Sequence, residues 1–430
     1  MGKMFRDPLY NYIELADDPC ALELISTPVF QRLRRIHQLG VTHYTYPGAQ
    51  HDRLSHSLGV YHLARMATDR VIRLRGEQRF RRGADLVMAV ALLHDVGHGP
   101  FSHLVEPCLG VDHEDWTCRI IESPDHQISK ILEKHQVPPT EAVALITGKV
   151  SDDRRWMQTL VSSQLDVDRL DYLRRDSLMT GAGYGHFDFH RLLNTLEVWE
   201  EDSRTDLAWP REKSLYAIEE YIFARYYMYQ NVYMHATTRG IEMLLREMWR
   251  VGKELFDNGD QDELVGEIRA FWGAEEPDID AYLAIEEFTL LHQIAAWRRG
   301  KHPVLADLAR RFLDRDHFVA IPLTIASDQI DADGADGLEH QLRELADKAG
   351  FMPDHYVLRD QIKAKYRQPY ITPPEGDELT SINAIRVLDG AEPKEISTLL
   401  ERLRPVTQVV APSVNFYVPR EVRQAYNHQA

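Results

Sequence analysis

The chain has 430 residues, a formal net charge of −17 at pH 7 and three cysteines. A chain of this length can bury a large core and is expected to form two or three domains. Its longest uninterrupted apolar run, residues 86–93, is too short to span a bilayer, and the N-terminus has no apolar signal core. The cysteines show no CxxC spacing, which disfavours a disulfide framework and a zinc knuckle. We therefore expect a folded cytoplasmic protein with no membrane partner.

The expected elements divide the chain into three parts. Residues 1–255 carry mostly helical patterns, with long Pro-free or periodic runs at 55–75, 85–94, 161–175 and 216–250. Residues 256–315 stay helical but become more acidic. After residue 316, short β-rich runs (318–325, 382–387, 409–418) alternate with amphipathic helices (338–349, 395–403). The sequence predicts a mainly α fold, with a helical core (1–255), a helical extension (256–315) and a smaller C-terminal α+β lobe (316–430).

The acidic net charge conceals a basic segment. Residues 32–82 hold eleven arginines, no lysine and three acids, so this segment carries +8 and the rest of the chain −25. Guanidinium groups match phosphate oxygens in a bidentate manner, so such a segment can face phosphates. A solvated helix face is an equally good interpretation for residues 70–82. The acidic remainder disfavours general nucleic-acid binding.

Histidines concentrate in one stretch of the chain. Nine of the twenty fall between His37 and His113. In the middle lies LLHDVGHGPFSH, where His94 and Asp95 follow an apolar helix whose expected buried face is Leu86, Ala89, Val90 and Leu93. A His-Asp pair that ends a packed helix is held rigidly beside an open loop, which suits a metal site.

His56 and Asp168 are candidates for the same site. His56 lies on a preceding helix among apolar residues, and the alternative is a satisfied core histidine. Asp168 is expected on a core-facing stripe with Val161, Leu165 and Tyr172. A buried carboxylate is costly unless it is paired or metal-bound, so a salt bridge to a nearby arginine is the alternative. Two imidazoles and two carboxylates suit a divalent metal ion (Mn, Fe, Zn, Ni or, less well, Mg).

A series of motifs continues this pattern over roughly residues 3–250: KMFRDP, STPVFQRLRRIHQLG, YPGAQHDRLSHSLGV, LLHDVGHGPFSH, DHE and LDVDRLDYLRRD. Together they resemble the HD-domain phosphohydrolases, specifically the sterile-alpha-motif/HD-type and bacterial dNTP triphosphohydrolases. Because the match starts at the third residue, we expect no sterile-alpha-motif domain. The resemblance implies hydrolysis of a dNTP at the α-phosphorus to a deoxynucleoside and inorganic triphosphate. It also implies a homo-oligomer, dimer or tetramer, often with nucleotides at subunit contacts.

The resemblance assigns roles by position. The residues that match the family's metal ligands are His56, His94, Asp95 and Asp168. His98 and His103 match histidines of the cleft beside the metal, with a loop-ordering role as the alternative. His113, with Glu114 beside it, resembles the catalytic histidine, which could protonate the departing 5′-oxygen. Contacts to phosphate and sugar are implied for Arg53, Arg169, Tyr172, Gln38 and Leu39.

Two positions depart from the family pattern. Arg225, Tyr229 and Tyr233 are spaced i, i+4, i+8 where relatives place Arg, His and Tyr against the γ-phosphate and base. Tyr229 therefore leaves base preference open, and packing of these aromatics in the core is the alternative. Ser26 stands where animal relatives have the Asp that binds an activating guanine nucleotide. We expect activation by this allosteric nucleotide to be lost or altered.

Two other functions stay open. One is a different HD phosphohydrolase, acting on nucleoside monophosphates or a signalling nucleotide, although the doubled GYP signature of cyclic-di-GMP enzymes is absent. The other is a non-catalytic nucleotide or single-stranded nucleic-acid binder. The complete metal set and His113 argue against the second of these.

Overall fold

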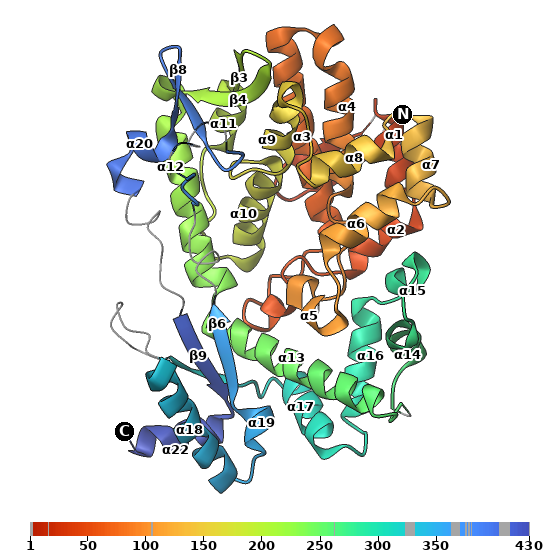
Figure 1. Ribbon diagram of the computed structural model, residues 1–430, viewed down its shortest axis with the longest axis vertical. Helices are drawn as coiled ribbons and strands as arrows, with labels where there is room; N and C mark the ends of the chain where they lie inside the picture. The colour runs from red at the N-terminus through yellow and green to blue at the C-terminus, as the bar shows by residue number, and fades with distance from the viewer. Residues whose placement is uncertain are drawn as a thin grey trace.

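The computed structural model describes the chain apart from residues 1–2, 16, 105, 262, 323–331, 363–369, 375, 377–378, 380, 404–412 and 430. Figure 1 shows a mainly helical molecule with small sheets, two of which include C-terminal strands, so the predicted fold class is confirmed. No helix in this described part combines the length and apolar character needed to cross a membrane.

The centre of the molecule is a pair of long helices, α3 (Arg53–Arg75) and α4 (Glu77–Leu93), with α10 (Val167–Thr180) packed on α3. Asp52 caps α3 by accepting a hydrogen bond from the Ser55 backbone N–H. Gly76, at φ +97°, separates α3 from α4, a backbone conformation that favours glycine. The expected buried face of α4 is confirmed, since all four of its residues are buried.

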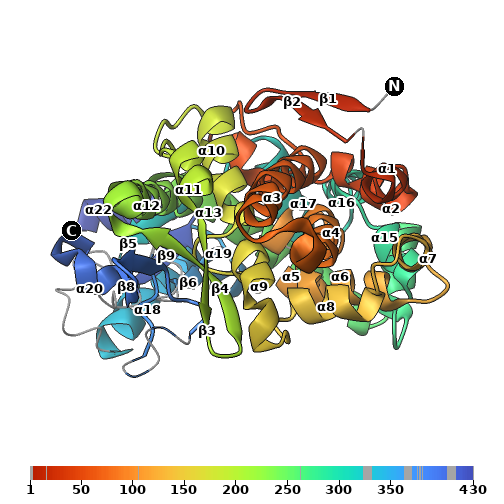
Figure 2. The ribbon, with the colours of Figure 1, turned by 90° about the horizontal axis from the view of Figure 1, so that it is seen from above.

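Shorter elements surround these helices, as the view from above in Figure 2 shows. An N-terminal hairpin, β1 (Met4–Asp7) and β2 (Asn11–Glu14), lies in a region where mainly helix was expected, and so does a second hairpin, β3 (Glu197–Glu201) and β4 (Arg204–Pro210). The surrounding helices are α1 (Pro19–Leu24), α2 (Pro28–Arg32), α5 (Glu106–Leu109), α6 (His113–Glu122), α7 (Gln127–Lys134), α8 (Pro139–Ile146), α9 (Arg155–Val161), α11 (Phe189–Thr195) and α12 (Arg211–Met228).

Two helices that the sequence predicts as continuous are interrupted. The helix expected over 161–175 divides into α9 and α10, because Asp166 is extended and caps α10 by accepting from the Arg169 N–H. Asp168 therefore lies in the first turn of α10 and does not share a helix face with Val161. The helix expected over 216–250 divides at a π-helical turn (Tyr229–Tyr233), and His235 caps the next helix, α13 (Ala236–Asp257).

The helical extension and the preceding helix α13 form a second hydrophobic core. It consists of α13, α14 (Gly266–Gly273), α15 (Ile279–Leu283), α16 (Glu287–Trp297) and α17 (Pro303–Leu313). Phe101 and Leu104, from the loop between α4 and α5, are buried in this core. The extension thus packs against the loop that contains HGPFSH.

The C-terminal part divides between two sheets. Strand β9 (Ser413–Val418) pairs with β5 (Val319–Pro322) and β6 (Leu358–Ile362), accompanied by α18 (Ala332–Lys348), α19 (Pro353–Tyr356) and α22 (Arg420–Gln429). Strands β7 (Arg386–Asp389) and β8 (Glu392–Glu395) instead extend the β3–β4 sheet, because β7 runs parallel to β4. The helix expected at 395–403 is only α20 (Ile396–Leu399) and a short 3-10 turn. The division into 1–255, 256–315 and 316–430 stays a prediction.

Candidate functional site

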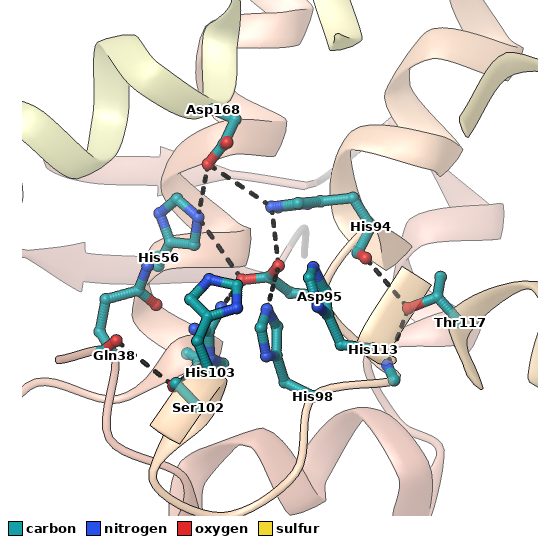
Figure 3. A network of polar contacts seen from close by, with 12 residues as sticks. Gln38, His56, His94, Asp95, His98, Ser102, His103, His113, Thr117 and Asp168 are labelled. Carbon is teal, nitrogen blue, oxygen red and sulfur yellow. Dashed lines mark hydrogen bonds and ion pairs between the residues drawn. The ribbon is translucent and has the colours of Figure 1, made fainter. Parts of the chain in front are cut away.

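Three packed helices bring the predicted metal ligands together. His56 lies on α3, His94 and Asp95 follow the last turn of α4, and Asp168 lies in the first turn of α10. Gly59 permits the contact of α10 with α3, since a Cβ there would lie 2.0 Å from Asp171 Oδ1. The backbone thus places four ligand-type side chains at one point, as Figure 3 shows.

The donor atoms of these four side chains lie at the spacing of a coordination shell. His56 Nε2 is 3.0 Å from Asp168 Oδ1 and 3.6 Å from Asp95 Oδ2. His94 Nε2 is 3.4 Å from Asp95 Oδ1 and 3.7 Å from Asp168 Oδ1. Ligands bound at about 2.0–2.2 Å to a common ion are separated by about 3–3.5 Å. His56, His94 and Asp95 therefore form a cluster that can hold a metal ion.

The electrostatics of the cluster also favour a cation. Burial opposes protonation of His56, but hydrogen bonds to Asp168 and Asp171 outweigh it and raise its pKa to about 10. Burial opposes ionisation of Asp95, yet Arg53 and His94 hold its pKa well below the ordinary value. His94 Nε2 is buried and has no hydrogen-bond partner among the described residues. A metal ion would satisfy this nitrogen and replace the protons that the carboxylates attract.

Further contacts orient the ligands. His56 Nδ1 lies 2.9 Å from Asp171 Oδ2, and His94 Nδ1 lies 2.8 Å from the carbonyl oxygen of Ala91. Such contacts at the second ring nitrogen set the direction of the first, which is the usual arrangement around metal-binding histidines. Asp171 was not among the site residues predicted from the sequence. Its spacing from Asp168 (i, i+3) and from Arg175 (i, i+4) was the available signal.

A second group of polar side chains adjoins the metal cluster. Glu106 Oε1 lies 2.8 Å from His113 Nδ1, 3.2 Å from His103 Nδ1 and 3.6 Å from His98 Nδ1. The rings of His98 and His113 are stacked, with centroids 3.8 Å apart. Burial opposes ionisation of Glu106, but contacts with His103 and His113 hold its pKa below the usual range.

Glu106 was not among the site residues predicted from the sequence, although it lies three residues after His103. Glu114, which the resemblance places beside the catalytic histidine, is exposed on α6. The structure places Glu106, and not Glu114, in the histidine group among the residues it describes. Gly97 lets α6 approach, because a Cβ there would lie 2.3 Å from the carbonyl oxygen of His113.

The residues predicted to bind phosphate and sugar are distributed around this centre. Arg53 is buried, pairs with Asp95 and donates from Nε to Ser102 Oγ at 2.9 Å. Gln38 lies in the loop before the 3-10 turn at Gly40–Tyr44, and its Oε1 is buried without a partner among the described residues. Leu39 follows it in the chain, directly before this turn.

The remaining residues predicted to bind the substrate form an aromatic and cationic wall: Arg169, Tyr172, Arg225, Tyr229 and Tyr233. The ring centroids of Tyr172 and Tyr233 are 6.2 Å apart, and those of Tyr229 and Tyr233 are 5.0 Å apart. The Arg225 guanidinium lies 5.7 Å from the Tyr229 ring. Tyr233 donates from its hydroxyl to Asp176 at 2.7 Å. Arg225, Tyr229 and Tyr233, which the sequence predicts as one stripe, therefore contact one another in succession at the π-helical turn.

The helical extension holds the HGPFSH loop from behind. Tyr282 donates from its hydroxyl to the Gly97 carbonyl oxygen at 2.6 Å. The buried Arg32 donates to the carbonyl oxygens of His98 and Ile285, at 2.7 and 2.8 Å. Glu287 accepts from the backbone N–H groups of His37 and Phe101, at 2.7 and 3.2 Å. Three side chains thus link α15 and α16 to the loops that carry the site.

Comparison with known proteins places the chain in a family. An HD-domain model matches residues 53–176, which hold all four candidate ligands. The uncharacterized protein YwfO of Bacillus subtilis (strain 168) is 35% identical over 397 residues, 92% of this chain and 87% of YwfO. A phosphohydrolase from Bacteroides thetaiotaomicron VPI-5482 has a TM-score of 0.80 at 25% identity, over 97% of this chain and 100% of that chain. The chain belongs to the HD-domain phosphohydrolase family.

Within this family, similarity to a protein of named activity covers less of the chain. Human deoxynucleoside triphosphate triphosphohydrolase SAMHD1 is 28% identical over 277 residues, which is 57% of this chain and 44% of SAMHD1. This chain therefore matches less than half of the length of SAMHD1, whereas it matches YwfO along most of both chains.

Proposed function

We propose that this chain hydrolyses deoxynucleoside triphosphates at the α-phosphorus and releases a deoxynucleoside and inorganic triphosphate. The observation that carries the proposal is a metal cluster accompanied by two different groups: a half-buried His–Glu pair and two arginines with buried N–H groups that have no partner among the described residues. The first can move a proton and the second can bind phosphate. The similarity to SAMHD1, a triphosphohydrolase by name, supports the same substrate class.

The arginines suit a substrate with several phosphates. Arg169 Nε and Arg225 Nε and Nη1 are buried and have no hydrogen-bond partner among the described residues. Burial and the nearby Arg169 charge oppose protonation of Arg225, but Tyr172 and Tyr221 outweigh them and keep the pKa of Arg225 above its ordinary value. Arg169 pairs with Asp166 through its Nη1, but buried N–H donors that have no acceptor are costly unless a ligand satisfies them. A triphosphate supplies about four negative charges and oxygens in the matching bidentate geometry.

The four ligands His56, His94, Asp95 and Asp168 would hold a divalent metal ion. When bound, such an ion supplies Lewis acidity, which lowers the pKa of a water and polarises a phosphate oxygen. Arg53 keeps Asp95 ionised and orients it through their salt bridge. Gln38 Oε1 is free to accept a hydrogen bond from a hydroxyl of the sugar.

His113 would donate the proton that the leaving group needs. As a water oxygen bonds to the α-phosphorus and this water releases one proton to solvent, the bond from phosphorus to the 5′-oxygen breaks, and the 5′-oxygen takes a proton from His113 as the nucleoside leaves. Glu106, whose Oε1 lies 2.8 Å from His113 Nδ1, would orient the ring so that its Nε2–H can act as the acid. His98, stacked on His113, and His103 complete the wall of this group.

The test is product analysis with each dNTP, dNMP and NTP after loading the protein with Mn²⁺. Intact triphosphate and deoxynucleoside are expected from dNTPs. Stepwise phosphate release, or turnover of monophosphates alone, would favour the other HD phosphohydrolases. Asp168→Ala should abolish turnover and metal retention, whereas Asp69→Ala, an exposed acid on the same helix as His56, should change neither. Assembly into a dimer or tetramer and control by an allosteric nucleotide stay predictions for mass photometry and GTP titration.

A further inference from the structure

The group formed by His98, His103, Glu106 and His113 has the composition of a metal site in its own right. Four donor atoms, one from each residue, lie within 4.8 Å of one another. Glu106 Oε1 faces the Nδ1 atom of each histidine, and Figure 3 shows the three imidazoles beside the metal cluster. This ligand set shares no residue with His56, His94, Asp95 and Asp168.

The spacing of these donors suits a small four-coordinate ion. Zn²⁺ binds imidazole nitrogen and carboxylate oxygen at about 2.0–2.2 Å, so tetrahedral ligands are about 3.3–3.5 Å apart. The three distances from Glu106 Oε1 to the imidazole nitrogens, 2.8, 3.2 and 3.6 Å, bracket that value. The contacts of Glu106 are therefore at the separations that a shared ion would impose.

The described protein groups satisfy only one of the three histidines, His103, which hydrogen-bonds to Glu106 at 3.2 Å. One carboxylate oxygen faces three imidazole nitrogens, and His98 Nδ1 is buried with no hydrogen-bond partner among the described residues. His98 is 1% exposed, so bulk water does not compensate. His113 Nδ1 meets the same oxygen without hydrogen-bond geometry. An ion at the centre would give each of these lone pairs a partner.

The two ligand sets meet at one imidazole. His98 Nε2 lies 3.4 Å from Asp95 Oδ1, in the metal cluster, while its Nδ1 faces Glu106. An ion bound by Nδ1 would therefore be on the opposite edge of the His98 ring from the first metal. Three nitrogens and one oxygen favour Zn²⁺, Ni²⁺ or Cu²⁺ over Mg²⁺ and Mn²⁺, which prefer oxygen.

We propose that His98, His103, Glu106 and His113 bind a second transition-metal ion, best matched by Zn²⁺, and that this ion inhibits the enzyme. The binding is independent of the proposed function, whereas the inhibition rests on it. A metal on His113 Nδ1 displaces the proton of the imidazolium and neutralises the charge of Glu106 that stabilises it. The ring then keeps a single N–H, which is a far weaker acid than an imidazolium. Proton donation to the 5′-oxygen is thereby lost.

The experiment loads the full chain with one equivalent of Mn²⁺ and titrates Zn²⁺ or Mg²⁺. Metal per chain is measured by mass spectrometry after gel filtration, beside turnover of a dNTP. We expect one additional Zn²⁺ with Mn²⁺ retained, a loss of turnover of at least tenfold, and no effect of Mg²⁺. Co²⁺ in place of Zn²⁺ should give the intense visible bands of tetrahedral coordination.

Two variants test the ligands. Glu106→Gln and His103→Ala should each lose the second equivalent of Zn²⁺ while keeping the first metal, and Glu122→Gln, an exposed acid on α6, should bind both. Failure to bind a second ion, its exchange for Mn²⁺, or its persistence in both variants would overturn the site. Binding with undiminished turnover would overturn the inhibition. A chain that turns over no nucleotide would refute the proposed function and leave the metal count to decide the site.

Discussion

Replacement of Glu287 is expected to loosen both loops around the candidate site, although Glu287 contacts neither ligand set. Its side chain is 3% exposed at the start of α16. It accepts from the backbone N–H groups of His37 and Phe101 and pairs with the His37 imidazole. The same loops meet at Ser102, which donates to the His37 carbonyl oxygen and accepts from Arg53. Glu287 is therefore a positioning residue that acts through backbone.

The expected loss in the free energy of unfolding depends on which hydrogen-bonding groups each variant leaves without a partner. Glu287→Ala strands two backbone N–H groups and one imidazole, and buried unsatisfied donors cost about 1–3 kcal/mol each. Allowing for partial relaxation, Glu287→Ala should lower the free energy of unfolding by about 3–5 kcal/mol, the range for breaking a buried ion pair. Glu287→Gln keeps an oxygen for the backbone N–H groups and should cost only about 1–2 kcal/mol.

The effect on catalysis should separate from the effect on metal binding. A displacement of about 1 Å in a catalytic group can cost about 100-fold in rate. Glu287→Ala should therefore reduce kcat by tenfold or more while one metal ion per chain is retained, and Glu287→Gln should recover most of the loss. Unfolding by urea, metal content and steady-state kinetics measure the three quantities.

The control is Glu276→Ala, an exposed acid in the same extension, which should change the free energy of unfolding by less than about 0.5 kcal/mol. Glu287→Ala within about 1 kcal/mol of the wild type, at unchanged kcat, would refute the reasoning. So would an equal loss in the Ala and Gln variants, because the argument depends on the oxygen that Gln keeps.

Three further predictions follow from single contacts. The hydrogen bond to Glu287 raises the pKa of His37. This pair therefore stabilises the fold fully below the unfolded pKa of about 6.5 and loses its contribution as pH rises through the higher folded pKa. In urea unfolding, Glu287→Gln should lower the free energy of unfolding more at pH 6 than at pH 9, and the reverse order would contradict the assignment. Gly59→Ala should lower Tm and metal content together, with about 2–3 kcal/mol lost to overpacking, because its Cβ would lie 2.0 Å from Asp171 Oδ1; an unchanged Tm would count against the close approach of α3 and α10. Asp171→Asn should weaken Mn²⁺ binding by about 10–100-fold in calorimetry, since Asp171 orients His56 and is not itself a ligand; wild-type affinity would show that His56 needs no such support.

Local pattern was enough to predict the strongest parts of the site. The 3.6-residue periodicity of apolar residues on α4 is a property of neighbouring residues, so it indicated where His94 and Asp95 emerge from a buried helix. The mainly α fold class followed from the same patterns. The prediction that four ligands form one metal site, by contrast, depended on the family resemblance. Nothing in the spacing of His56 and Asp168 along the chain determines that their side chains lie close together.

Features that depend on long-range packing were not available from the sequence. The division between α9 and α10 arises from the extended backbone at Asp166, and the pairing of β7 with β4 joins segments far apart in the chain. Glu106 contacts His113 because α5 and α6 lie close together in the fold, whereas Glu114 is only the neighbour of His113 in the sequence. Hydrophobic periodicity reports which face of an element is buried, but not against which other element.

The sequence by itself therefore determined the helical class, the C-terminal end of α4 and the residue types that can bind a metal. These depend on propensities and periodicity over a few turns of chain. Only the tertiary structure decided that α10 brings Asp168 to within 3.0 Å of His56 and that Glu106 lies among three imidazoles. It also decided that Glu287 of the extension binds the backbone of both loops. Those contacts are made between distant segments, and their distances are set by how helices pack, which no local pattern encodes.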